Sequence, residues 1–409
     1  MKKGIFTKFL LLVLAVSVIG STLLIGGCGK DDSDDNVVKD VTPDVTPAVA
    51  KRTMASAFRS DGAYAFIHGT NSPDGSKMFV VLNETISASS RTMTGQFTSY
   101  ILKMSDVTAG TVSGAEVTSA KIDGATAFRQ SYTPDGTKIV QAAKDRVVVL
   151  KASDLSVLHS TTDVGGGSAA FENHDALTID NDYALLALQS KATATTNTVV
   201  AKVVLYDLNT GAAVGAAANI CTPCHDSVAA GGTGGAAKNH PMCGIDGKFT
   251  KGSDGKYTGT LYSSSVAGGH IVGVDLVIDP SNTTAPITAS NKFKKQIADS
   301  NVAEGTAKDI PMFHDVRYDA DAKRVYYSAI GKDSTGGATD GRVHMGYIDL
   351  ADNNSAHDAT ISLKDGSAGP IYCGSGLTGD YFIPQTMNYP AYIDAVPKSL
   401  ITKGAAINP

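Results

Sequence analysis

The sequence predicts an all-β fold, and three observations support this prediction. Five segments share one order: a short extended lead, a turn of the Asp-Gly kind, and an apolar run. That order is typical of a β-hairpin. Each hairpin is followed by a further apolar run that closes on a polar turn, and almost no helix is indicated. The five segments begin at His68, Arg129, His174, His240 and His314.

The repeat length narrows the architecture. The units start about 45 to 75 residues apart and each supplies about four strands, yet a single unit cannot bury both of its faces alone. This predicts a β-propeller of six four-stranded blades, counting a weaker unit at 379–397, or of seven if 51–58 closes another. An array of immunoglobulin-like sandwiches explains the repeats less well, because they are too short for whole domains.

The N-terminus is a different kind of sequence. Basic residues precede an apolar run from Phe9 and small residues before Cys28, which is typical of a secretory signal. The ending Ile-Gly-Gly-Cys28 resembles the lipobox of bacterial lipoproteins, which implies cleavage before Cys28 and lipidation of its thiol. An uncleaved membrane helix is the alternative.

The domain boundaries follow from composition. The segment 28–54 is acidic, contains proline and has few large apolar residues, so it is expected to be a flexible tether. We therefore predict a signal peptide at 1–27, a lipidated tether at 28–54, a propeller at 55–400 and a tail at 401–409. By the same resemblance, Gly29 implies a lipid anchor in the outer membrane, facing the periplasm or the cell surface.

Charge excludes one class of partner. The formal net charge is -5, and acidic and basic residues are interleaved through the body of the chain. Without a basic patch, no nucleic-acid partner is expected.

A motif in the glycine-rich stretch after the third unit predicts a cofactor. Cys221, Cys224 and His225 fit CxxCH, in which two thiols attach a c-type haem and the histidine binds its iron. Two intervening residues hold both sulfurs on one edge of the macrocycle. We predict one covalent haem c on a loop at 211–243, packed against the propeller.

Two other readings of this motif remain open. A thioredoxin-like redox pair would need a βαβ pattern, which does not surround it. Structural zinc would need another close pair, and His240 and Cys243 lie nearby. Cys243 and Cys373 form a disulfide or stay as two thiols.

The second axial ligand of the haem is predicted to come from the following strand. His240 and Met242 alternate along an extended segment and so point to the same side, where either could reach the iron. His240 is preferred because other histidines share its register, and His174 is the next candidate.

That register predicts a ring of polar residues at the channel mouth. His68, Arg129, His174 and His240 each stand six residues before the turn aspartates Asp74, Asp135, Asp180 and Asp246, and His314 is one step further from Asp321. Innermost propeller strands line the channel, so His68, His174 and His314 are expected to converge as haem ligands, proton donors or a second metal site. Duplicated blades that kept a capping histidine are the alternative.

The turns SPDGSKMFVV and TPDGTKIVQ resemble YVTN-type surface-layer propellers and the propeller domains of periplasmic haem and copper enzymes. The chain lacks the full histidine set of nitrous oxide reductase and shows no separate cytochrome domain like that of the cytochrome-type nitrite reductases. Fold analogy does not carry activity.

Two main functions remain. The first is a membrane-anchored monohaem cytochrome that transfers electrons to redox partners such as other cytochromes. The second is an oxidoreductase whose haem or channel metal keeps an open position for a small substrate. A surface-layer or adhesive propeller is a third, weaker reading.

Overall fold

The computed structural model describes residues 48–60, 64–87, 92–162, 164, 171–190, 201–220, 244–265, 270–296, 312–330, 343–361, 372–386, 391–403 and 405–408. The chain separates into Met1–Val45, which lies outside these residues, and Thr46–Pro409. The predictions for the signal peptide, for Cys28 and for most of the tether therefore fall outside the described residues. Within the described residues, no helix is long and apolar enough to span a membrane.

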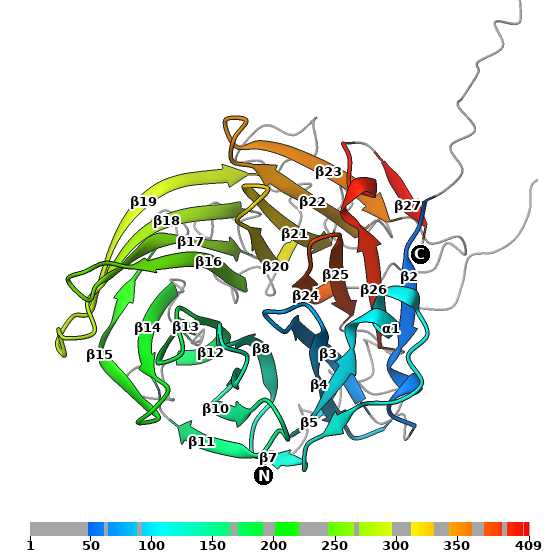
Figure 1. Cartoon of the computed structure of the whole chain (residues 1–409), viewed down its shortest axis with the longest axis horizontal. Helices are drawn as coiled ribbons and strands as arrows, with labels where there is room; N and C mark the ends of the chain where they lie inside the picture. The colour runs from blue at the N-terminus through cyan, green and yellow to red at the C-terminus, as the bar shows by residue number, and fades with distance from the viewer. Residues whose placement is uncertain are drawn as a thin grey trace, which may run out of the picture. The chain divides into compact units, whose positions relative to one another are not determined.

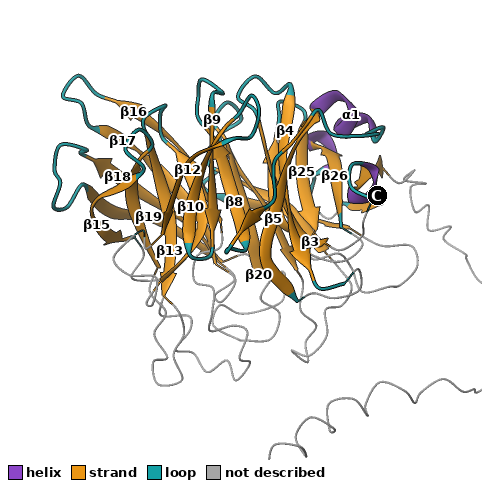
Figure 2. Ribbon diagram, turned by 90° about the horizontal axis from the view of Figure 1, so that it is seen from below, coloured by secondary structure: helices purple, strands orange, loops and turns teal. Residues whose placement is uncertain are grey.

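Six mainly antiparallel sheets surround a central axis, which confirms the six-bladed β-propeller (Figure 1). In the side view the blades stand next to one another with their strands running along that axis (Figure 2). From inner to outer edge, blades 1 to 3 are β3 (Tyr64–Asn71), β4 (Lys77–Thr85), β5 (Met93–Lys103), β6 (Val117–Thr118) and β7 (Ile122–Asp123); β8 (Ala127–Tyr132), β9 (Lys138–Ala143), β10 (Arg146–Lys151) and β11 (Val157–Thr162); β12 (Phe171–Thr178), β13 (Tyr183–Ser190), β14 (Ala201–Asp207) and β15 (Ala212–Asn219).

The second half of the ring repeats this arrangement. Blades 4 to 6 are β16 (Gly244–Lys251), β17 (Tyr257–Ser265), β18 (His270–Ile278) and β19 (Ile287–Gln296); β20 (Met312–Asp319), β21 (Arg324–Ile330), β22 (Val343–Asp349) and β23 (Ser355–Ile361); β24 (Tyr372–Leu377), β25 (Tyr381–Thr386), β26 (Tyr392–Pro397) and β2 (Lys51–Met54). The helices described are the short α1 (Met104–Ala109), η1 (Ala55–Ala57) and η2 (Lys398–Leu400).

Both ends of the described chain close the ring. β2 pairs antiparallel with β26, so the segment 51–58 completes the sixth blade and does not form a seventh. Arg52 reinforces this pairing, because its Nε and Nη2 donate to the two carboxylate oxygens of buried Asp394 at 2.8 and 2.9 Å. β1 (Ala48–Val49) and β27 (Ala406–Asn408) add parallel strands to the outer edge of blade 5.

The hydrophobic core lies between blades. The runs Phe79–Leu82 in β4 and Val147–Leu150 in β10 are wholly buried, although alternate residues of a strand point to opposite faces. Both faces of a blade are covered by its neighbours, so the middle strands are apolar at every position. One such cluster joins Leu185 and Leu205 of blade 3 to Leu261 and Val274 of blade 4.

The repeated turns have the structure that the sequence predicts. Asp74 Oδ1 accepts hydrogen bonds from Ser72 Oγ at 2.5 Å and Ser76 N at 3.0 Å, and these bonds lower the Asp74 pKa to about 2. The following Gly75 has a φ of 69°, a left-handed conformation that glycine adopts without strain. Asp135 and Gly136 repeat this arrangement in blade 2.

Candidate functional site in the central channel

The CxxCH motif lies outside the described residues, which end at Ile220 and resume at Gly244. Cys221, Cys224, His225, His240, Met242 and Cys243 are all in that interval. Its two ends are well defined: β15 is the outermost strand of blade 3, and β16 is the innermost strand of blade 4. Residues Ala212–Asn219 were expected to be loop, but they form β15, because Lys202 and Asp207 of β14 pair with Asn219 and Ala212.

Four polar residues occupy the same structural position in four inner strands. His68, Arg129, Asp175 and Asp315 each lie three residues before a hairpin pair. Those pairs are Asn71 with Met78, Tyr132 with Ile139, Thr178 with Ala184, and Tyr318 with Val325. The channel position is therefore shared by a histidine, an arginine and two aspartates.

The predicted histidine register is thus wrong in detail. The hairpin turn of blade 3 is one residue shorter than that of blade 1, so counting back from Asp180 placed His174 in register with His68. Pairing shows instead that Asp175 is equivalent to His68, and that His174 and His314 each lie at a β-bulge one residue earlier.

Asp246 is the second correction. It was expected in the turn of blade 4, but it lies within inner strand β16, and the turn follows Lys251. The Asp-Gly pair at 246–247 imitates the turn motif of the other blades. Asp246 is therefore a channel residue.

The histidines that can be described meet through an aromatic ring. Buried His174 stacks on Phe128 with ring centroids 4.6 Å apart, and buried His68 meets the same ring edge-on at 6.4 Å. Burial lowers the pKa of His174, although Glu172 lies 3.7 Å from its Nε2 and acts in the opposite direction. His174 is therefore neutral at pH 7.

The predicted second metal site stays a prediction. No group of three His, Cys, Asp or Glu side chains suited to a metal occurs among the residues that the structure describes. The side chains of His314 and Cys373 lie outside that part of the structure, as do His225 and His240.

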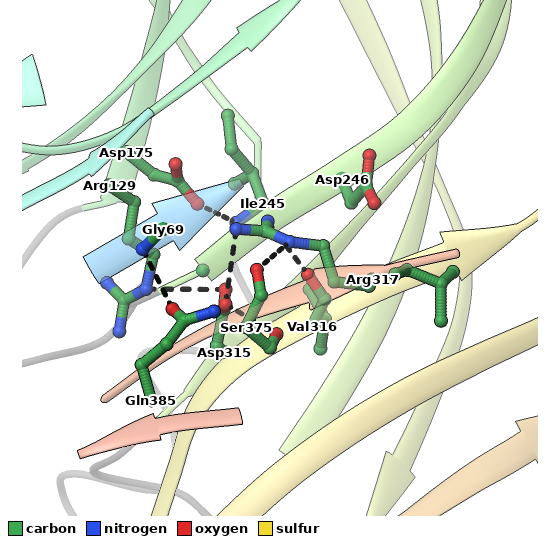
Figure 3. Close-up of polar contacts among 12 residues, drawn as sticks. Gly69, Arg129, Asp175, Ile245, Asp246, Asp315, Val316, Arg317, Ser375 and Gln385 are labelled. Atoms are coloured by element: carbon green, nitrogen blue, oxygen red, sulfur yellow. Dashed lines mark hydrogen bonds and ion pairs between the residues drawn. The ribbon is translucent and has the colours of Figure 1, made fainter. Parts of the chain in front are cut away.

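A buried ion network crosses the middle of the channel (Figure 3). Arg129 Nε of blade 2 lies 3.3 Å from Asp315 Oδ1 of blade 5, and Arg317 Nη2 lies 3.3 Å from Asp315 Oδ2. Ser375 Oγ of blade 6 donates to Asp315 Oδ2 at 2.7 Å. Asp315 is 0% exposed and Arg129 3%, so these charges depend on each other and not on water.

The other channel aspartates bond to the backbone of the next blade. Ile245 N donates to Asp175 Oδ2 at 2.8 Å, and Tyr318 N donates to Asp246 Oδ2 at 2.7 Å. On the far side of the ring, Gly69 N donates to Gln385 Oε1 at 2.8 Å (Figure 3). These bonds fix adjacent inner strands at a definite height.

Close packing explains one glycine of this site. A Cβ on Gly244 would lie 2.6 Å from Asp315 Oδ1 and 2.9 Å from Asp315 Cα, so only glycine lets β16 approach β20 so closely.

The carboxyl groups of this region hold protons more tightly than usual. Burial, aided by the charge of Asp315, raises the Asp175 pKa to about 7 against the pull of Arg317 and Arg129. Burial likewise raises the Asp246 pKa to about 6. The cause is that the described channel side chains place three carboxylates beside two guanidinium groups.

Sequence reasoning missed the aspartates that organise the channel. The available signal was the His-Asp dipeptide at 174–175 and 314–315, which repeats at the same place in blades 3 and 5. Attention to the histidine of each pair hid the carboxylate that makes the interblade bonds.

Comparisons with known proteins identify no family. No protein-family description matches the sequence, and no curated protein matches it. Among solved structures, the crystal structure of the Myceliophteria thermophila Cps50 (Swd1) beta-propeller domain is similar, with a TM-score of 0.43 and 9% identity over 84% of this chain and 99% of that one. By its own strand pairing, this chain is a six-bladed β-propeller.

Proposed function

We propose that this protein is a lipid-anchored monohaem c-type cytochrome that transfers electrons in the periplasm or at the cell surface. The observation that carries the proposal is Cys221, Cys224 and His225 in CxxCH spacing, in a chain whose N-terminus has the pattern of a lipoprotein signal. Other cytochromes are the expected redox partners.

The fold supports this proposal by what it does at the two ends of the motif segment. Ile220, the last residue before the segment, is buried in the core between blades 3 and 4. Gly244, the first residue after it, packs against Asp315 of blade 5. A redox centre held between two fixed strands would present the same edge to each partner, which favours electron transfer.

The chain supplies the ligands that such a group needs. Cys221 and Cys224 would hold the macrocycle, His225 would bind one side of the iron, and His240, Met242 or His174 would bind the other. The haem, once bound, supplies the one-electron chemistry. The alternative is an oxidoreductase, in which the sixth position stays open to a small substrate.

The first experiment tests attachment. The full chain is produced in a host with a working cytochrome-maturation system, denatured in acid and organic solvent, and weighed. Thioether bonds survive this treatment, so the mass should include one haem. The double variant Cys221→Ser/Cys224→Ser should lose haem, while the control Cys243→Ser keeps it. A haem-free, zinc-loaded protein would contradict the proposal.

The second experiment tests the sixth ligand. His240→Ala should give a high-spin iron that binds added small ligands, while Met242→Ala leaves the optical spectrum nearly unchanged. The reverse result assigns the ligand to Met242. A wild-type iron that is already high-spin would instead favour the oxidoreductase, because its sixth position would be open.

A further inference from the structure

A pocket lies at the end of the channel where the inner strands enter their hairpin turns. Its volume is about 250 Å³, and residues from all six blades line it. One from each blade, in order, are Asn71, Gln130, Leu177, Asp246, Arg317 and Leu377. At roughly 30 Å³ for each water of the liquid, the space equals that of about eight waters.

This pocket is separate from the ion network and from the aromatic histidine group. Gln130 and Ala176 line it, and they directly follow Arg129 and Asp175 toward the turns. The strands therefore carry a charged layer in the channel and, next to it on the turn side, the layer that surrounds the pocket.

Gln130 has no obvious structural role. It is 1% exposed, and neither its Nε2 nor its Oε1 has a hydrogen-bond partner among the residues that the structure describes. A buried amide without partners is costly to the folded state, and native proteins contain few of them. A side chain that lines a cavity under these conditions is suited to a ligand that both donates and accepts.

The charges around the pocket do not favour an ionic ligand. Asp246 and Arg317 both line it, with opposite signs. Both are already engaged: Asp246 accepts from Gly247 N and Tyr318 N, and Arg317 donates to the carbonyl oxygens of Ser375 and Val316. The unused group in the wall is the neutral amide.

A groove of about 710 Å³ adjoins the pocket between the hairpin turns of blades 1 and 2. The two cavities share Pro73 and Tyr132. The Tyr132 hydroxyl is buried and has no hydrogen-bond partner in the described part of the chain, and burial raises its pKa, so it remains a proton donor. Ser76, Thr137 and Ser153 add hydroxyl groups to the groove.

We propose that this end of the channel binds a neutral polyhydroxylated molecule of the carbohydrate class. One sugar ring enters the pocket, where its hydroxyl groups satisfy the amide of Gln130, and the next residue of a longer glycan lies in the groove against Tyr132. Vicinal hydroxyl groups match these two unpartnered groups because each hydroxyl both donates and accepts.

The test uses the full-length chain and named probes. Glucose, galactose, mannose, cellotriose and maltotriose are titrated by calorimetry and by saturation-transfer NMR, with ethylammonium and acetate as charged probes of similar polarity. At least one neutral sugar should bind, and Gln130→Met should weaken it at least tenfold. Gln96→Met, on the outer part of blade 1, is the matched control and should leave binding unchanged.

A second readout distinguishes a ligand-binding role from a structural one. Because Gln130→Met removes a buried amide that lacks partners, the melting temperature of the sugar-free protein should stay the same or rise by about 1–3 °C. A structural glutamine would give a lower melting temperature. Loss of sugar binding without loss of stability supports the proposal.

Several outcomes would overturn it. Absence of binding by all five sugars, equal binding by Gln130→Met, or binding of ethylammonium or acetate alone would each do so. The pocket is independent of the haem proposal, so the Cys221→Ser/Cys224→Ser variant should bind sugar as the wild type does. A sugar that binds only the haem-loaded chain would also contradict the pocket assignment.

Discussion

The middle of the channel and its turn-side end treat buried polar groups in opposite ways. In the middle, Arg129, Asp315 and Arg317 form ion pairs that reach across the ring. At the turn-side end, Gln130 is equally buried and has no hydrogen-bond partner among the described residues. The fold needs the first set to hold its blades together, whereas the second set is left open at a cost in stability, which is the pattern of a binding site.

The largest effect should come from the middle of the channel. Asp315→Ala leaves Arg129 and Arg317 buried beside a missing partner, so the free energy of unfolding should fall by about 3–5 kcal/mol. Urea denaturation of both proteins measures this. A loss below about 1 kcal/mol would mean that the network is not structural and would remove the contrast between the two regions.

A second, smaller effect compares two glutamines of blade 2. Gln141 is as buried as Gln130, but its Nε2 donates to the carbonyl oxygens of Phe128 and Ala142 at 2.9 and 2.6 Å. Gln141→Met should therefore destabilise the protein by about 1–3 kcal/mol, in the opposite direction to Gln130→Met. Equal shifts in the same direction in urea would end the comparison.

The third effect is a pH dependence. The folded state holds a proton on Asp246 up to about pH 6, whereas the unfolded chain releases it near 3.8, so this carboxyl's contribution to stability is lost as pH rises through that window. Arg317 and Asp315 of β20 face the group, together with Asp175 of β12 and Arg129 of β8.

The measurement is the stability difference between Asp246→Asn and the wild type from pH 4 to 8. Asparagine does not titrate, so the difference should shift in favour of the variant as pH rises to about 6 and then level off. His174 titrates in both proteins and cancels. A flat difference would show that Asp246 ionises normally in the folded protein.

The smallest effect is expected on the outer face of blade 4. Lys292 Nζ lies 3.4 Å from Asp275 Oδ1, and both side chains are 49% exposed. Asp275→Asn should change the free energy of unfolding by less than about 1 kcal/mol. This variant is the surface control for Asp315→Ala, and a comparable loss at both positions would mean that burial is not what makes the channel pairs important.

Local patterns were sufficient to predict the propeller, because each blade is a contiguous run of strands. The turns at Asp74 and Asp135 could be located from their own residues, since the hydrogen bonds that define them are local. The contact between Arg129 and Asp315 could not, because it joins opposite blades and exists only once the ring has closed. Asp246 was misassigned for a related reason: a dipeptide does not reveal whether it ends a strand or lies within one.

The candidate site divides along the same line. The CxxCH motif can be read directly because its chemistry depends on spacing alone, and its haem stays a prediction. The pocket around Gln130 could not be predicted, since six separate strands build it and no short segment carries its pattern.

The pairing of β2 with β26 has a consequence for how the chain matures. The strand that seals the ring is made early, and its partner is among the last residues to be translated. Until then β2 has an unsatisfied edge, and blades 1 and 6 have no neighbour to hold them. Folding therefore cannot finish during synthesis or export, and a chain that loses residues 391–403 would release its N-terminal strand as well. Such a chain would be a good substrate for envelope proteases, so the closing strand would act as a check that only full-length copies survive.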